Sequence, residues 1–188
     1  MIYSWAMLKL SDNPPVVHPA EAAVAALSGR WRVAHTKARF EKAFAWDLLR
    51  RDIAYFLPLL TRVRISGGKK RRVLMPVFPS YVFFCGNDEA RVTALTTNRL
   101  CQVIEVVDQR QFIAELAAIQ KALAGQAQLD PYPFAAEGRR CRVKAGPFQG
   151  LEGVVASRAN VTRLVLQVSI LGQGAAMEID ADLLEPAD

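Results

Sequence analysis

Lysine and arginine gather in one stretch of this chain, where they could bind a partner of opposite charge. Residues 31–85 contain 12 Lys and Arg residues against 3 Asp and Glu residues, whereas the rest of the 188 residues is close to balanced. A local cationic excess attracts a polyanion through long-range electrostatics and counterion release. The same charge would also serve as a solvated face that aids solubility. Charge alone favours neither interpretation.

Residue types that perform covalent or metal chemistry are sparse. The two histidines are His18 and His35, and the three cysteines, Cys85, Cys101 and Cys141, are widely spaced in apolar or strand-like runs. This pattern predicts buried free thiols and no metal site. The sequence has no Ser/His/Asp constellation, no glycine-rich phosphate loop after a strand and no carboxylate pair in an evident pocket. We therefore expect no enzyme and no cofactor.

Residues 142–155, RVKAGPFQGLEGVV, are rich in glycine and hold an aromatic side chain at the centre of a tight connection. Glycine reaches a positive φ without a steric clash, and Pro147 presets φ for a turn. The stretch is therefore expected to hold Phe148 at the tip of a loop between two strands. Phe148 either closes the end of its own domain or contacts a partner, and both alternatives stay open.

The strands and helices predicted from the sequence are those of an α+β protein, and they divide into two structural units. In residues 37–52 the side chains of Phe40, Phe44 and Leu48 recur at helical spacing, and a Gly-Gly turn joins two strands into a hairpin with a basic tip. The strands and helices that follow are predicted at 80–86, 87–97, 101–108 and 110–125. The order predicts a split βαβ plait over residues 31–125, with helices covering one side of an antiparallel sheet.

The second unit is predicted to be a small barrel. Residues 126–137 contain two prolines and no apolar stripe, which indicates a linker. Residues 138–188 contain about five short strands, and the clean alternation from Leu164 to Ile170 places one face inward. A closed five-stranded barrel would leave no open edge. Residues 1–30 are expected to form an N-terminal extension with one short helix.

Two stretches resemble one known family. Residues 137–157 resemble a KOW motif, and WRVAHTKARFEKAFAWDLL together with PVFPSYVFF resembles the N-terminal domain of the NusG family of transcription elongation factors. The resemblance spans residues 31–186 and implies an NGN domain followed by an SH3-like KOW barrel. It also implies a cytoplasmic, monomeric, non-enzymatic protein, and no apolar window in the sequence is long enough to span a membrane.

The resemblance implies that an apolar patch binds the clamp helices of the largest subunit of RNA polymerase. Carried onto this chain, the patch comprises Phe78, Pro79, Tyr81 and Phe83, with Tyr55 and Phe56 nearby. Tyr81 and Phe83 share a strand face, opposite Val82 and Phe84, so we expect Tyr81 to face the partner and Phe84 to face the core. Thr96 and Thr97 would touch the other side of the cleft or simply end a helix, and the second alternative is favoured.

The resemblance also implies that the positive charge lies along non-template or upstream DNA. The cations assigned to DNA are Lys37, Arg39, Lys42, Lys69, Lys70, Arg71 and Arg72. The first three are expected at a helix start, where backbone N–H groups add to the attraction for phosphate. Contacts of this kind carry little sequence information.

In the KOW unit the resemblance implies a partner site at Phe148, Ile170 and Leu171, for the termination factor Rho or a small-subunit ribosomal protein. This chain has Ile-Leu-Gly-Gln at 170–173 where many members have Ile-Phe-Gly-Arg, so an aromatic and a cation are missing. The leading hypothesis is therefore a specialised paralogue that acts as an antiterminator. The alternatives are a general factor that couples to Rho or the ribosome, and a ribosome-associated RNA-binding protein.

Overall fold

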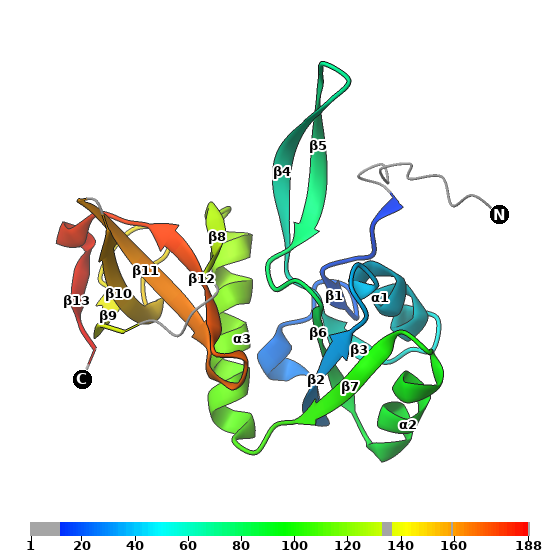
Figure 1. Ribbon diagram of the computed structural model, residues 1–188. Coiled ribbons are helices and arrows are strands. Elements are labelled where there is room, and N and C mark those ends of the chain that lie inside the picture. The colour runs from blue at the N-terminus through cyan, green and yellow to red at the C-terminus, as the bar shows by residue number, and fades with distance from the viewer. Residues whose placement is uncertain (1–11, 133–136, 159, 188) are drawn as a thin grey trace.

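The computed structural model of the protein describes residues 12–132, 137–158 and 160–187 (Figure 1). A five-stranded antiparallel sheet forms the first unit, in the order β1-β3-β6-β2-β7. Its strands are β1 Val17–His18, β2 Arg30–Thr36, β3 Ala54–Phe56, β6 Tyr81–Gly86 and β7 Leu100–Glu105. The helices are α1 Glu41–Leu49, α2 Asp88–Thr96 and α3 Gln109–Ala124, and 3-10 turns lie at Val24–Ala26, Ser169–Leu171 and Ala181–Leu183. The predicted plait order is present.

Helices cover both faces of this sheet, whereas the sequence pattern predicted cover on one side only. Phe44 of α1 and Ala94 of α2 pack with Val82 and Phe84 in one apolar cluster. Phe112 of α3 packs with Phe83 on the opposite face, with ring centroids 5.6 Å apart. Since successive strand residues point to opposite faces, the consecutive large side chains of β6 make both faces apolar. Each face therefore needs its own cover.

Helix α1 begins at Glu41, four residues later than the sequence pattern predicted. The backbone of Arg39 has a φ of +68°, which is left-handed and cannot continue a right-handed helix. The amide of Phe40 donates to the carbonyl of Lys37 at 3.1 Å, so these residues form a turn before the helix. Lys37 and Arg39 therefore lie in the connection between β2 and α1.

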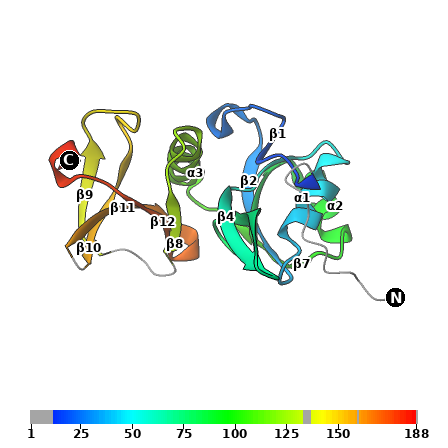
Figure 2. The same cartoon turned by 90° about the horizontal axis from the view of Figure 1, so that it is seen from above.

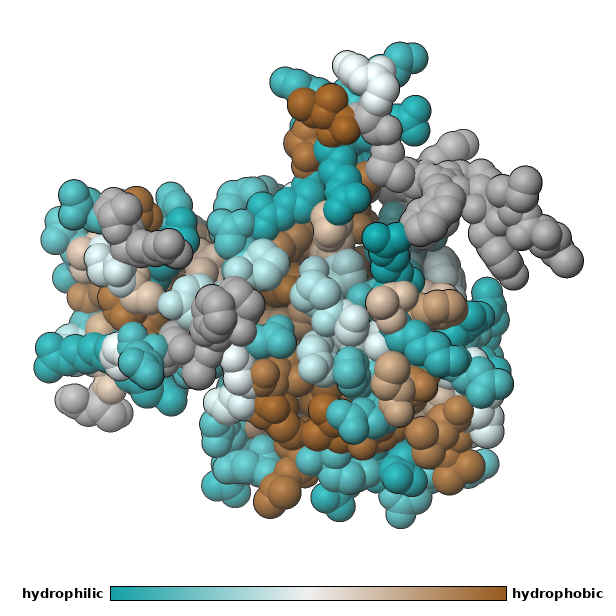
Figure 3. All heavy atoms as spheres, in the orientation of Figure 1, coloured by the Kyte–Doolittle hydropathy of each residue, from teal (hydrophilic) through white to brown (hydrophobic). Residues whose placement is uncertain are grey.

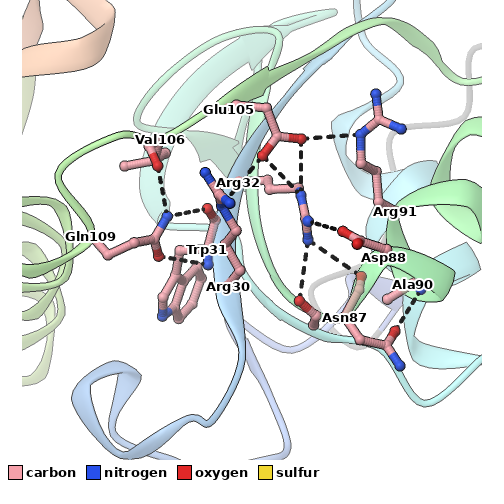
Figure 4. Close-up of polar contacts among 11 residues, drawn as sticks. Arg30, Trp31, Arg32, Asn87, Asp88, Ala90, Arg91, Glu105, Val106 and Gln109 are labelled. Carbon is pink, nitrogen blue, oxygen red and sulfur yellow. Dashed lines mark hydrogen bonds and ion pairs between the residues drawn. The ribbon is translucent and has the colours of Figure 1, made fainter.

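A buried arginine ties the strands to the start of α2 (Figure 4). Arg32 on β2 is 2% exposed, and its guanidinium contacts Glu105 at 3.1 Å and Asp88 at 2.6 Å. Glu105 also accepts from Nε of Arg91 at 3.0 Å. In the same view, the side-chain amide of Gln109 bonds both the N–H and the carbonyl of Trp31, at 2.8 Å each. These contacts fix the starts of α2 and α3 against β2, because Nε, Nη1 and Nη2 of the buried Arg32 all have acceptors.

The second unit is an open six-stranded antiparallel sheet, not the closed five-stranded barrel that we expected. The order is β13-β9-β10-β11-β12-β8, and no ladder joins its two ends within the described residues. Its strands are β8 Leu129–Tyr132, β9 Arg139–Val143, β10 Glu152–Arg158, β11 Val161–Val168, β12 Gln173–Glu178 and β13 Leu184–Pro186. Strand β8 lies where the prolines suggested a linker. The free edge of β8 is covered by Arg62, whose Nη2 donates to the carbonyl of Leu129 at 3.0 Å.

Helix α3 lies between the two sheets (Figure 2). Leu116 and Ile119 are fully buried in an apolar cluster that runs from Trp31 in the first sheet to Leu166 in the second. Ala117 and Ala118 are partly buried against this cluster, and they line a pocket of about 430 Å³ between α3 and the strands β10 and β11. The carboxylate of Glu115 on α3 accepts from the backbone N–H of Ser169 at 3.1 Å. The two units therefore share one core.

The described part of the N-terminal extension, residues 12–30, also contributes to this core. Val17 on β1 pairs with Phe56 on β3, which adds an edge strand to the first sheet. Val24 is fully buried, and the side chain of Gln120 on α3 bonds the backbone of Ala22 and Val24. Residues 17–24 thus pack on the first unit.

Phe148 lies at the tip of the β9–β10 loop as predicted, and it packs on the end of α3. A Cβ added at Gly125 would lie 2.6 Å from Cε1 of Phe148, so the ring rests directly on the glycine. Gly125 has a φ of −78°, which any residue adopts. Any side chain at Gly125 would therefore force the Phe148 ring to shift.

Replacing Gly125 with Ala should destabilise the protein, because the new methyl group overlaps the Phe148 ring. We expect a loss of about 1–3 kcal/mol in the free energy of unfolding, which is the usual cost of overpacking, measured by urea denaturation. In a Phe148→Ala background the same change should cost much less, since the ring is gone. An equal cost in both backgrounds would contradict the contact.

Candidate nucleic-acid interface

A two-stranded hairpin projects from the body of the molecule (Figure 1). Strands β4 Leu59–Ser66 and β5 Lys69–Pro76 pair with each other in a separate sheet. Gly67 and Gly68 form the turn with φ values of +55° and +72°, which other residues adopt only with strain. The predicted Gly-Gly hairpin is present. Its tip carries the four predicted cations, Lys69, Lys70, Arg71 and Arg72, all of them exposed.

The cations at the hairpin tip differ from Arg62, which forms an ion pair with Asp130, and from several other cations of the first unit. Arg50 and Arg99 contact the carboxylate of Asp47, at 3.1 and 3.0 Å. Within the described residues, the four tip cations and Arg64 form no ion pair. Their charge is therefore available to a partner, whereas the charge around Asp47 is partly neutralised.

A pocket of about 340 Å³ lies between the start of α1 and the base of the hairpin. Its lining includes the cations Arg39, Lys42 and Arg64, and the acidic residue Glu41, whose carboxylate accepts from the backbone N–H of Ser80 at 2.6 Å. The apolar lining residues are Val73, Leu74, Met75, Pro76 and Pro79. The structure thus brings two predicted DNA-binding residues together with Arg64, which the sequence reasoning missed. The alternation of arginine with Val63 and Ile65 along β4 was the available signal.

Two of the predicted cations near α1 are held by backbone carbonyls. Nζ of Lys42 donates to the carbonyl of Leu74 at 2.6 Å, and burial lowers the pKa of this ammonium group. Nζ of Lys37 donates to the carbonyl of Asn98 at 2.8 Å. These contacts hold the two ammonium groups in place while leaving N–H donors for a second acceptor.

Four of the aromatic residues assigned to polymerase binding lie in the core, so the expectation of an exposed aromatic patch is wrong for them. Tyr55, Phe56, Phe78 and Phe83 are at most 1% exposed. Strand β6 lies between β2 and β3 and is covered by helices on both faces, which places its side chains inside the protein. Phe78 packs edge-on against Phe83, with ring centroids 5.8 Å apart.

Tyr81 is the aromatic residue of this set that reaches the surface. It is half-buried and stacks on His35, its cross-strand neighbour, with ring centroids 5.0 Å apart and planes at 22°. Pro79 is exposed, and it lines the cationic pocket. The remaining candidate contact is therefore the stacked Tyr81–His35 pair, two residues along the chain from Pro79. Sequence reasoning did not identify His35, although alternation places it on the same sheet face as Val33.

Thr96 and Thr97 form hydrogen bonds with backbone carbonyls at the end of α2. The hydroxyl of Thr96 donates to the carbonyl of Thr93, and that of Thr97 donates to Ala94, both at 2.7 Å. Their donor capacity is therefore used in the last helical turn. The geometry agrees with the alternative in which they end the helix.

The three residues assigned to a KOW partner face the body of the protein. Phe148, Ile170 and Leu171 are half-buried and pack against the core cluster that includes α3. Ile170 also lines a groove of about 390 Å³ with Ile104 and Phe112 of the first unit. In this conformation the three side chains already have an intramolecular partner.

No group of three or more His, Cys, Asp or Glu residues in the described part of the chain could hold a metal ion. Cys85 and Cys141 are buried as predicted, but Cys101 on the edge strand β7 is exposed, which corrects the expectation for that thiol. Among the helices described, none is long and apolar enough to cross a membrane.

Comparison with known proteins identifies a related family. Residues 29–122, half of the chain, match the family model described as NusG, transcription termination factor nusG. The match begins just before β2 and ends within α3, so it includes the hairpin, the pocket and the Tyr81–His35 pair. No curated protein matches the chain.

Alkaline pH should destabilise the fold through Cys85. Burial raises the pKa of this thiol from about 9 to about 11, and burial also raises the pKa of the Tyr55 phenol. Because folding favours the neutral thiol, its contribution to stability is complete below pH 9 and decreases as pH rises from 9 to 11. Urea denaturation at pH 8, 9, 10 and 11 would measure this decrease. A Cys85→Ala variant should lose less stability over this range than a Cys101→Ala control, and identical profiles would contradict the assignment.

Proposed function

The chain belongs to the NusG family of transcription factors, and from this premise we propose that it binds RNA polymerase during elongation and suppresses pausing and termination. Members of the family are non-enzymatic elongation and termination factors that interact with RNA polymerase. The observation that carries the proposal is the hairpin tip, whose four cations form no ion pair within the described residues, beside a pocket lined by three further cations, within the segment that matches the family. This surface suits a partner that offers both nucleic acid and protein.

The polymerase contact is assigned to the clamp helices of the largest subunit and to Tyr81, His35 and Pro79. Stacked rings bury much area at little entropic cost, so a half-exposed pair of this kind is a suitable anchor. The buried Phe83 follows in the same strand and supports the backbone beneath Tyr81. The four core aromatics thus have a supporting role in this proposal, while the surface residues make contact.

The DNA contact is assigned to the hairpin and to the residues before and within the first turn of α1. Lys37, Lys42 and Arg64 would meet phosphates of the non-template strand, and the hairpin tip would reach the upstream duplex. Phosphate contacts position a protein without reading sequence, which suits a factor that travels with polymerase. Binding both the clamp and the DNA would favour the closed clamp and thereby suppress pausing.

We assign the second sheet to a KOW module in which β8 is an added strand. The five strands β9–β13 follow the predicted order, and the glycine-rich loop carries Phe148 at its tip. The packing of Phe148 and Ile170 on the body supports an antiterminator over a factor that couples to Rho or the ribosome. Phe148 and Ile170 are the side chains that would contact Rho or the ribosome if they were not packed on the body of the protein.

Replacing Tyr81 with Ala should weaken capture of purified core polymerase by about tenfold or more, as expected for an aromatic anchor. The protein should stay folded because the side chain is half-exposed. On a template with a Rho-dependent terminator, the unaltered protein should increase readthrough and the variant should not. A Ser157→Ala control, exposed on β10, should behave like the unaltered protein. Increased termination would instead favour the general factor, and unchanged capture would contradict the role of Tyr81.

Neutralising Lys69 and Arg71 with Gln should flatten the salt dependence of duplex DNA binding. Each lost phosphate contact lowers the slope of log K against log salt by about 0.9, so the pair should lower it by about two. The matched control changes Arg50 and Arg51 to Gln, because these cations contact Asp47. Equal slopes for both double variants would reject the hairpin as the DNA contact.

A further inference from the structure

We propose that one face of the β4–β5 hairpin enters the major groove of duplex DNA and contacts thymine methyl groups through Val63 and Ile65. This inference rests on the proposed function, because it assumes that the hairpin meets the upstream duplex. It goes further in assigning a groove, a reading face and a base feature. The argument depends on the pairing register, the exposure of two apolar side chains, and the size and charge of the hairpin.

The register gives the hairpin two different faces. Val63 lies opposite Arg72, and Ile65 lies opposite Lys70. Directly opposed residues of an antiparallel pair project to the same side, so one face alternates apolar and cationic side chains along the ribbon. Arg64 lies opposite Arg71 and therefore belongs to the other face.

Val63 and Ile65 are exposed without a structural reason in the described chain. They are 61% and 70% exposed, and the hairpin pairs with no third strand among the described residues. Hydrophobic side chains are visible on the projecting hairpin in Figure 3, among hydrophilic ones. Strand propensity alone does not explain valine and isoleucine here, because threonine is also β-branched and would suit a water-exposed strand face. The apolar atoms are thus available for a contact outside the chain.

The dimensions of the hairpin suit the major groove. Each strand has 8 residues, which corresponds to a length of about 26 Å at about 3.3 Å per residue. The major groove of B-form DNA, about 12 Å wide, admits a two-stranded ribbon, whereas the minor groove is about half as wide. The deep, narrow major groove of duplex RNA excludes it. The geometry therefore favours DNA over RNA.

The charge favours a nucleic acid over a protein partner. The sequence has no acidic residue between Asp52 and Asp88, while it has six cations in that interval. A protein surface of mixed charge would gain little from such a uniform ribbon, whereas a phosphate backbone on each side of a groove would attract it along its whole length. The floor of the major groove offers apolar groups only where thymine presents its methyl group. Val63 and Ile65 match that feature.

The hairpin is also held at its base, which reduces the ordering needed for insertion. Arg62, on the face opposite to Val63, forms an ion pair with Asp130 at 2.5 Å and donates to the carbonyl of Leu129 on β8. Both contacts join the hairpin to the second sheet. A ribbon fixed at one end loses less conformational freedom on binding than a free one.

The test compares two duplexes that differ only in the thymine methyl group, with deoxyuridine replacing thymidine throughout. The full-length protein should bind the uracil duplex about three- to fourfold more weakly for each methyl group contacted, the value of one buried methyl group. Val63→Ser and Ile65→Ser variants should lose this difference while keeping the salt slope, since no cation is removed. A Val92→Ser control, which changes an exposed apolar residue on α2, should keep the difference.

The outcomes separate this inference from the proposed function. Equal binding of both duplexes by the unaltered protein would overturn the methyl contact and leave the DNA contact standing. A failure to bind either duplex would overturn the DNA contact itself. If the Ser variants lost polymerase capture and the unaltered protein showed no methyl preference, the face would belong to a protein contact and the inference would be wrong.

Discussion

Helix α3 has to bury two sides, and most of the architecture follows from this requirement. Phe112, Leu116 and Ile119 are buried in the core. Ala117 and Ala118, on another side of the helix, face the second sheet. Water would be an unfavourable environment for either surface, so neither sheet is complete without the helix. The polar contacts at Glu115 and Gln109 then fix the orientation of a helix that apolar contact alone would leave free to slide.

The hairpin differs from the rest of the first unit in where its side chains lie. The central sheet places its aromatics inside, whereas β4 and β5 leave the body soon after Leu60 and carry cations outward. The body thus supplies stability, and the ribbon supplies a charged surface with little core of its own. The pocket at the base of the hairpin is the point where these two regions meet.

The local sequence pattern predicted the elements well because each has a nearby physical cause. Asn87 caps α2 by accepting from the amide of Ala90, the two glycines close the hairpin, and helical spacing marks Phe112 and Leu116. Helix α1 was predicted four residues too early because the left-handed φ of Arg39 has no signal in its residue type. The order of the plait elements along the chain was also predicted, whereas the edge strand β1 was not.

Features that depend on distant contacts were not predictable from the sequence. Whether an aromatic in β6 faces a helix or a partner depends on which helices cover each face, and the sequence pattern indicated cover on one face only. Likewise, strand β8 forms in a proline-containing stretch because β12 offers it a free edge. The paired residues are as distant in sequence as Leu129 and Met177, so no local pattern reveals this pairing. The cationic site was better predicted, since Arg39 and Lys42 needed only Arg64 to complete the rim.

The shared helix has a practical consequence for dividing the chain. A cut after Gly125 would leave the alanine side of α3 in water and remove the seat of Phe148, and the released C-terminal fragment would lack the cover over β10 and β11. Neither half would then be a self-sufficient folding module, although the family match ends close to that point. Evolutionary gain or loss of the C-terminal half would therefore require compensating polar substitutions along one side of α3.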